Sequence, residues 1–294
     1  MACRPAPALA TVAAMTDGED SARGTDHWLR INRENWDDRV RVHAGSDFYD
    51  LPGFRAGDDP LRPVEVAEVG DVTGLRLLHL QCHMGQDTLA WARRGAFVTG
   101  VDFSSAAIGV ARGLADELGL ADRARFVVSD VYEAPTALDG ERFDVVYTGV
   151  GALVWLPDLT RWARVVASSL TMGGFLYLAE FHPVSDVLGE DGSRVEFDYF
   201  DGSPERVDYP HTYTDGPPLG KTVSVQWRHQ LGEVVTALAS AGLRIDFLRE
   251  RPDTLFQRYS SLERRPSGEF AFPEGRPRVP LMYALRATRD RPAD

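Results

Sequence analysis

Apolar and amphipathic segments alternate along most of the chain from residue 75 onward. Short apolar runs predict strands at 76–80, 97–101, 125–128 and 144–147 and in the segment FLYLAE. Helical patterns separate them, from about residue 87 to 94, from about 105 to 118 and in DLTRWARVVASSL. A parallel sheet with crossover helices needs this alternation, so the sequence predicts an α/β fold.

The alternation pauses around the fifth predicted strand. Gly173 and Gly174 precede that strand, where the preceding helix is expected to end. Residues 183–225 are acidic, aromatic and rich in turn residues, which predicts an inserted loop or hairpin. The helical pattern LGEVVTALASAG and the strand pattern LRIDFLRE follow. The irregular segment 251–280 predicts a lid or binding loop before a last strand, LMYALRAT, and the tail 290–294 is expected to fray.

The residues before the alternating region divide into two parts. Residues 25–70 predict a helical cap, which starts with an amphipathic helix over 27–42. Residues 1–24 are rich in alanine, proline and small polar residues but lack the apolar core of a secretory signal. We therefore predict a disordered leader, with Met1 or Met15 as the start.

Charge and composition narrow the classes of function. The formal net charge is −12 and arginines are interspersed with acids, which argues against a nucleic-acid backbone as partner. No segment approaches the roughly 18 uninterrupted apolar residues of a membrane span. The two cysteines, Cys3 and Cys82, are a poor basis for a disulfide framework. We therefore expect a cytoplasmic protein that binds neither nucleic acid nor membrane.

Acids follow two successive predicted strands. In an open parallel sheet, ligands bind beyond the carboxyl ends of the strands. Asp102 ends the second strand, where a carboxylate accepts hydrogen bonds from both hydroxyls of a ribose. Asp130 ends the third strand, where it is placed to accept from an adenine amino group. Each acid has a plainer alternative, because Asp102 and Ser104 also suit a helix cap and Asp130 suits the start of a turn.

With this order of elements, the chain resembles the class I S-adenosylmethionine-dependent methyltransferases over roughly 75–288. The resemblance rests on the two strand-end acids, on the fourth-strand segment FDVVYTGVGALVWLPD and on LTMGGFLYLAE. It implies a Rossmann-like, mostly parallel sheet of seven strands, with an antiparallel last strand and helices on both faces. It also implies a methyltransferase domain over 71–289, with 183–225 and 251–280 inserted as lids.

The opening loop departs from the family pattern D/E-x-G-x-G-x-G. His79 replaces the acid, Gln81 and His83 replace the first two glycines, and Gly85 remains. The segment LHLQCHxGxDTL resembles a bacterial branch of the family. His79 and His83 are four residues apart, which is a metal-ligand spacing on a helix but not across a strand and a loop, so we predict no metal site. The residues that the resemblance assigns to S-adenosylmethionine, and to S-adenosylhomocysteine as product, are Gln81, Cys82, His83, Gly85, Gln86, Asp102, Phe103, Ser104, Asp130, Val131 and Thr148.

The ends of the fourth and fifth strands supply candidate catalytic residues. His182 is the candidate general base, and Tyr147 forms an apolar wall beside the sulfonium. Glu180 either orients His182, if the strand continues that far, or binds a cation. His182 is equally compatible with a structural turn, and His211 and His229 are lower-ranked acid–base candidates. The candidate acceptor-binding residues are Trp36, Tyr49, Trp155, His211, Tyr213, Phe256 and Tyr259.

The leading interpretation is methyl transfer to an oxygen or nitrogen of a small molecule, by an in-line displacement that a general base can assist. The acidic insertion favours a cationic or neutral acceptor over a polyanion. Two other classes stay open. One is a pseudoenzyme that binds S-adenosylmethionine, or no cofactor, and acts through partners; the other is a nicotinamide-dependent oxidoreductase, against which the missing G-x-G-x-x-G argues. A homodimer through the first helix is also compatible with the sequence.

Overall fold

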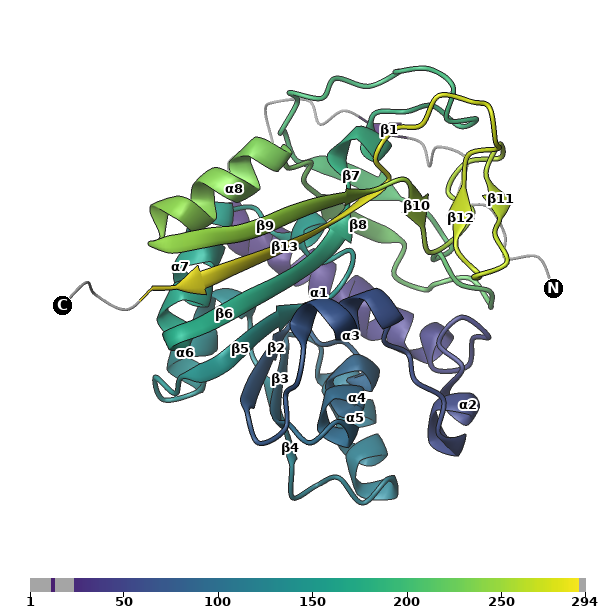
Figure 1. Cartoon of the computed structure of the whole chain (residues 1–294). Helices are drawn as coiled ribbons and strands as arrows, with labels where there is room; N and C mark the ends of the chain where they lie inside the picture. Colours follow the sequence, from purple (N-terminus) through teal and green to yellow (C-terminus); the bar gives the residue numbers. More distant parts are fainter. Residues whose placement is uncertain (1–11, 14–23, 291–294) are drawn as a thin grey trace.

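A seven-stranded sheet forms the centre of the computed structural model, which describes residues 12–13 and 24–290 (Figure 1). The strand order is β4-β3-β2-β5-β6-β13-β9. In that order the strands are Ala124–Val128, Phe97–Asp102, Arg76–Leu80, Phe143–Thr148, Leu170–Phe181, Met282–Arg289 and Leu243–Arg251. The strands from β4 to β6 are parallel, whereas β13 is antiparallel to both of its neighbours. The predicted mostly parallel sheet with an antiparallel last strand is therefore confirmed.

Helices cover both faces of the sheet (Figure 1). One face carries α3 (Pro63–Val69), α4 (Gln86–Arg93) and α5 (Ser105–Glu117), and the other carries α6 (Ala134–Ala137), α7 (Leu159–Ser169) and α8 (Leu231–Ser240). Successive side chains of a strand point to opposite faces, so Leu77 packs in one core with Trp91 and Leu78 packs in the other with Trp162. The central strands β2, β5 and β6 are thus buried on both faces, as their apolar sequences predict, whereas the edge strands β4 and β9 are partly exposed.

The N-terminal cap adds α1 (Gly24–His43) and α2 (Leu51–Ala56) to α3. α1 lies against α5 and against strand β8 of the first insertion. The amide of Asn32 bonds to both the N–H and the C=O of Val225 in β8, at 2.7 and 2.8 Å. The first insertion therefore holds the cap helix in place over the sheet.

The first insertion includes a hairpin of β7 (Glu205–Asp208) and β8 (Val223–Gln226), and the short strand β1 (Val12–Ala13) pairs with β7. β1 lies within residues 1–24, so its two residues depart from the predicted disordered leader. The rest of that leader before residue 24, and the tail after residue 290, lie outside the described residues.

The second insertion, 251–280, forms a small sheet of its own. β10 (Asp253–Thr254) and β11 (Glu263–Arg264) each pair antiparallel with β12 (Phe270–Ala271). A small apolar core supports this sheet and contains Tyr259, Leu262, Phe272 and Leu281. The segment is therefore more regular than the lid or binding loop that the sequence predicts.

β6 begins directly after α7, so the prediction that Gly173 and Gly174 end that helix is wrong. The two glycines lie inside the strand, where its pairing with β5 shifts between Phe143 and Val145. A Cβ on Gly174 would lie 2.9 Å from the carbonyl oxygen of Asp144, closer than real Cβ atoms approach. The glycines therefore permit a bulge at the start of β6.

Three short 3-10 helices follow the carboxyl ends of parallel strands. They are η2 (Val131–Glu133) after β4, η3 (Leu153–Trp155) after β5 and η4 (Pro183–Asp186) after β6. They bring polar residues to the end of the sheet where ligands bind in parallel α/β folds. Along the described ranges, no helix is long and apolar enough to cross a membrane.

Candidate functional site

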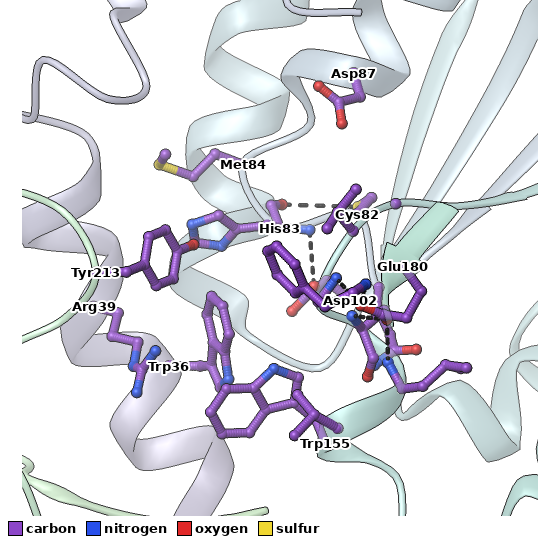
Figure 2. Close-up of a pocket in the computed structure, with 18 of the residues that line it drawn as sticks. Trp36, Arg39, Cys82, His83, Met84, Asp87, Asp102, Trp155, Glu180 and Tyr213 are labelled. Carbon is purple, nitrogen blue, oxygen red and sulfur yellow. Dashed lines mark hydrogen bonds between the residues drawn. The ribbon is translucent and has the colours of Figure 1, made fainter. Parts of the chain in front are cut away.

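A cavity of about 770 Å³ lies at the carboxyl ends of the parallel strands, within the usual size of a small-molecule site (Figure 2). α1, the loop after β2 and both insertions also contribute to its wall. The predicted site residues that line it are Trp36, Tyr49, Gln81, Cys82, His83, Gly85, Gln86, Asp102, Phe103, Asp130, Val131, Tyr147, Trp155, Glu180, His211, Tyr213 and Phe256. The predicted residues outside its wall are Ser104, Thr148, His182 and Tyr259.

The loop after β2 adopts the backbone of a glycine-rich loop although only one of the three glycines is present. Gln81, His83 and Gly85 have φ angles of 59°, 48° and 75°, in the left-handed region that glycine adopts most readily. These are the three glycine positions of the family pattern. The loop therefore keeps the shape of that pattern while adding two polar side chains.

The two added side chains fasten the loop to other parts of the wall. Gln81 Nε2 donates to the carbonyl oxygen of Ala152 at 2.9 Å. His83 Nε2 and His43 Nδ1 lie 2.9 Å apart, within hydrogen-bond distance, and His43 Nε2 lies 2.7 Å from Thr212 Oγ1. Burial lowers the pKa of His83 to about 3, so the ring is neutral at physiological pH. The added histidine therefore connects the loop to the cap helix and to the first insertion.

Asp102 is fixed at the end of β3 by backbone donors. One carboxylate oxygen accepts from the N–H of His83 and the other from the N–H of Ser104, both at 2.9 Å. Ser104 itself caps α5 and donates its hydroxyl to Asp37 at 2.5 Å, which keeps Ser104 out of the cavity. Burial raises the pKa of Asp102 to about 6, because the charged form is desolvated despite its donors.

Asp130 lies at the end of the neighbouring strand. Its carboxylate accepts from the N–H of Tyr132 at 2.8 Å and caps η2. Burial raises the pKa of Asp130. The cap is the plainer role that the sequence left open, yet the same side chain also lines the cavity. The two strand-end acids therefore face one cavity, as a ribose and an adenine would require.

Glu180 supports the segment after β5. Its carboxylate accepts from the N–H groups of Gly151, Ala152 and Leu153 at 2.7 to 3.0 Å, and from that of Phe181 at 2.8 Å. Burial raises the pKa of Glu180 to about 7. These contacts shape the cavity wall and do not orient a histidine, so the predicted partnership of Glu180 with His182 is wrong.

His182 lies behind the cavity wall. Its Nδ1 accepts from the N–H of Val184 at 3.1 Å, which caps η4, and its Nε2 lies 2.9 Å from Glu250 Oε1. Desolvation lowers the pKa of His182. His182 therefore has the structural role in a turn that the sequence left open. Its geometry does not favour a role as general base.

Two other histidines lie on the wall. His211 comes from the first insertion, and its ring centre lies 5.8 Å from that of Tyr209. His229 is tied by Nε2 to the carbonyl oxygen of Leu156 at 2.7 Å, and burial lowers its pKa. His211 is therefore the better placed of the two to exchange a proton with a bound acceptor.

A cluster of titratable groups lies beside the start of α4. The hydroxyl of Tyr147 donates to Glu65 at 3.2 Å, and its ring meets that of His79 at 4.8 Å. Asp87 in the first turn of α4 lines the same wall, and burial, reinforced by Glu65, raises its pKa to about 7. Burial also raises the pKa of Cys82, which is therefore a thiol and not a nucleophile. Sequence reasoning singled out neither Asp87 nor Glu65.

Aromatic side chains form the wall opposite the sheet. Trp36 and Trp155 meet edge to face at 5.2 Å, and Tyr213 stacks on Phe256 at 6.3 Å. The hydroxyls of Tyr49 and Tyr213 lie 2.5 Å apart. These predicted acceptor residues therefore come together, although they belong to the cap, to η3 and to both insertions. Thr148 and Tyr259 do not join them, because Thr148 is fully buried below the wall and Tyr259 packs in the core of the second insertion.

Sequence reasoning also missed Arg39, a buried residue of α1 on the same wall. Its guanidinium carbon lies 5.0 Å from the ring centre of Trp36 and 5.1 Å from that of Trp155. The i, i+3 spacing places Trp36 and Arg39 on one helix face, but the local sequence does not indicate that this face is buried. Among the described residues, no three His, Cys, Asp or Glu side chains gather into a metal site.

Known proteins resemble the chain in two ways. Residues 77–174 match the family described as a methyltransferase domain. A ubiquinone biosynthesis O-methyltransferase of Aeromonas salmonicida is 31% identical over 138 residues, which cover 46% of this chain and 56% of that protein. The chain thus spans about half the length of the curated relatives it matches.

Solved structures extend the likeness to most of the chain. An S-adenosylmethionine-dependent methyltransferase from Mesorhizobium loti has a TM-score of 0.57 at 21% identity, covering 80% of this chain and all of that one. The CcbJ methyltransferase from Streptomyces caelestis has a TM-score of 0.58 at 14% identity, covering 89% and 99%. At these identities the structural likeness concerns the fold. The sequence match and the sheet topology together identify residues 77–174 as a methyltransferase domain.

Proposed function

We propose that the protein transfers a methyl group from S-adenosylmethionine to an oxygen or nitrogen of a small molecule. The observation that carries this proposal is the convergence of Asp102, Asp130 and the left-handed loop at 81–85 on one cavity. They follow three neighbouring strands, so a single extended nucleoside can reach all of them. The methyltransferase domain over 77–174 contains every one of these groups.

The cavity offers polar atoms that suit this cofactor. Asp102 has spare lone pairs for two ribose hydroxyls, and Asp130 has them for an adenine amino group. Gln81 Oε1, His83 Nδ1 and Gln86 Oε1 are buried atoms that have no hydrogen-bond partner among the described residues. A buried polar atom without a partner is costly, so these three atoms favour a polar ligand group at the methionine end.

When bound, S-adenosylmethionine supplies a methyl group made electrophilic by a sulfonium. The protein then has to align an acceptor behind that methyl group and exclude water. The aromatic wall that contains Trp155 and Tyr213 suits both tasks, because it is apolar and its ring faces favour positive charge. Glu180 fixes the backbone of 151–153 on that wall, which makes it a positioning residue.

We assign proton transfer to His211 rather than to His182. An acceptor hydroxyl or ammonium has to lose a proton around the time of transfer, and a neutral imidazole on the cavity wall can take it. His211 lies on that wall and His182 does not. The acceptor would be a small metabolite, because the enclosed aromatic cavity has no open basic groove for a nucleic acid.

The test is transfer of labelled methyl groups from S-adenosylmethionine into a panel of small metabolites by the full chain. Asp102→Ala should abolish labelling, because it removes the ribose acceptor. The matched control is Asp122→Ala, an exposed acid in the turn before β4, which should leave labelling unchanged. Absence of labelled product, with S-adenosylhomocysteine still bound, would instead support the pseudoenzyme that the sequence left open.

One observation supports the pseudoenzyme as an alternative: side chains occupy two positions where the family has glycine. His83 brings a ring to a place where the family has none, and His43 holds it there. The nicotinamide-dependent alternative has no comparable support, because β13 runs antiparallel inside the sheet and the common dinucleotide-binding order has no such strand. The homodimer and the cytoplasmic location stay predictions.

A further inference from the structure

Arg39 is a buried cation whose charge is not balanced. It is 8% exposed, and among the described residues its only hydrogen bond runs from Nε to Asn35 Oδ1, at 2.7 Å. Among the side chains that the structure describes, no carboxylate pairs with its guanidinium. Two other largely buried arginines of this chain differ, because Arg62 pairs with Glu65 and Arg258 pairs with Asp186.

An unpaired buried charge is unfavourable, and no acid among the described residues neutralises the charge of Arg39. Taking a guanidinium out of water costs more than the aromatic contacts of Trp36 and Trp155 return. Desolvation lowers the pKa of Arg39, because burial disfavours the charged guanidinium. Such a group is retained at little cost only if a partner anion arrives from outside the chain.

The guanidinium is already oriented for such a partner. Asn35 holds its Nε and is itself anchored by donating to the carbonyl oxygen of Lys221 at 2.5 Å. The two terminal nitrogens of Arg39 are left for a bidentate contact, which is how arginine best binds carboxylates and phosphates. Because the side chain lines the cavity, a cavity ligand can reach it.

The position of Arg39 separates it from the cofactor residues. Arg39 and Asn35 share the face of α1 that lies against the first insertion, whereas Asp37 on another face contacts Ser104 beside the cofactor acid. In Figure 2, Arg39 and Trp36 extend from the cap helix on the opposite side of the view from Glu180. The guanidinium thus belongs to the aromatic wall, where the acceptor is expected.

We propose that Arg39 binds an oxyanion of the methyl acceptor, a carboxylate or a phosphate, while Trp36 and Trp155 pack against an apolar part of the same molecule. This inference rests on the proposed function and narrows its substrate class. It also replaces the cationic or neutral acceptor that the acidic insertion favours with a small anion. Polyanions remain disfavoured, because a single guanidinium neutralises about one charge.

The experiment measures binding of three probes of similar shape to the full chain, with and without saturating S-adenosylhomocysteine. Benzoate and phenyl phosphate carry the oxyanion, and benzamide is their neutral counterpart. Arg39→Met removes the charge but keeps much of the apolar stem. Arg33→Met is the matched control, because it makes the same change about 1.7 turns away at an exposed position of α1.

Wild type and Arg33→Met should bind at least one of the two anions about tenfold more tightly than benzamide. Arg39→Met should lose that preference and keep its affinity for S-adenosylhomocysteine. Equal affinity of wild type for all three probes, or no anion binding at all, would overturn the proposal. So would an approximately tenfold loss of S-adenosylhomocysteine affinity in Arg39→Met, because the guanidinium would then serve the cofactor carboxylate. Failure of wild type to bind S-adenosylhomocysteine contradicts the proposed function instead, and the probes then test Arg39 in the free chain.

Discussion

The backbone N–H of His83 donates to Asp102 Oδ2 at 2.9 Å, so the altered loop and the proposed ribose acid form one unit. This bond runs from a position where the family has glycine, and it needs the left-handed backbone that His83 adopts. A histidine at this place therefore does not disturb the carboxylate. It adds a side chain, while the backbone keeps the left-handed conformation of a glycine-rich loop.

Binding of S-adenosylhomocysteine should depend on pH through Asp102. Burial raises the pKa of this carboxyl to about 6, and the ionised form is the better acceptor for ribose hydroxyls. Affinity measured by calorimetry should therefore rise from pH 5 to 7, by up to about tenfold per pH unit below the pKa. Asp102→Asn should bind weakly with a flatter profile; an unchanged profile in this variant would assign the titration to another group.

The same pKa has a consequence for the stability of the free chain. Because the folded-state pKa is raised, protonation of Asp102 favours the folded state, and this contribution is lost as pH rises through about 6. Urea unfolding of wild type should show that fall. Asp102→Asn should lack this part of the fall, since an amide does not titrate.

Gly85 should tolerate no side chain. Its φ is 75°, and a Cβ there would lie 2.7 Å from the ring of Phe126 and 2.8 Å from the Cβ of Ala111. Gly119 has a similar φ of 66° with nothing within 4 Å, so it isolates the backbone cost. Gly119→Ala should cost about 1 kcal/mol and Gly85→Ala about 3 kcal/mol in urea unfolding. Equal losses would mean that the clash is relieved elsewhere.

Glu180→Gln should destabilise the segment after β5. An amide nitrogen would face N–H groups of 151–153 that the carboxylate now accepts, leaving at least one buried donor unpaired. We expect a loss of about 2 kcal/mol in the free energy of unfolding. Glu190→Gln changes an exposed acid in the same way and should have no effect. Full stability of Glu180→Gln would show that the carboxylate does not hold the wall.

Proton transfer should follow His211 and not His182. With an acceptor from the metabolite panel, His211→Ala should slow turnover about tenfold or more while S-adenosylhomocysteine affinity is kept. His182→Ala removes a ring behind the wall and serves as the comparison. The reverse ranking of the two variants in methyl transfer rates would restore His182 as the base.

Local sequence patterns were sufficient for the sheet and for the strand-end acids. β2 spans Arg76–Leu80 as its apolar run predicts, β3 ends at Asp102, and β4 ends two residues before Asp130. These features depend on alternation and on strand ends, which neighbouring residues determine. Asp102 and Asp130, which this reasoning selected, both lie on the cavity wall.

Residues whose roles depend on distant partners could not be predicted. His83 meets His43 across 40 positions, and Arg39 lies in the segment NWDDRV, which is typical of a solvated helix face. Only the packing of α1 against the first insertion buries that face. His182 followed a strand end, but η4 begins there and turns its ring behind the wall.

Calorimetric titration of the full chain with S-adenosylhomocysteine and, separately, with NAD tests whether the cavity binds S-adenosylmethionine. We predict saturable one-to-one binding of S-adenosylhomocysteine that Asp102→Ala abolishes, and no heat from NAD. Binding of NAD without binding of S-adenosylhomocysteine would show that the cavity serves a different cofactor.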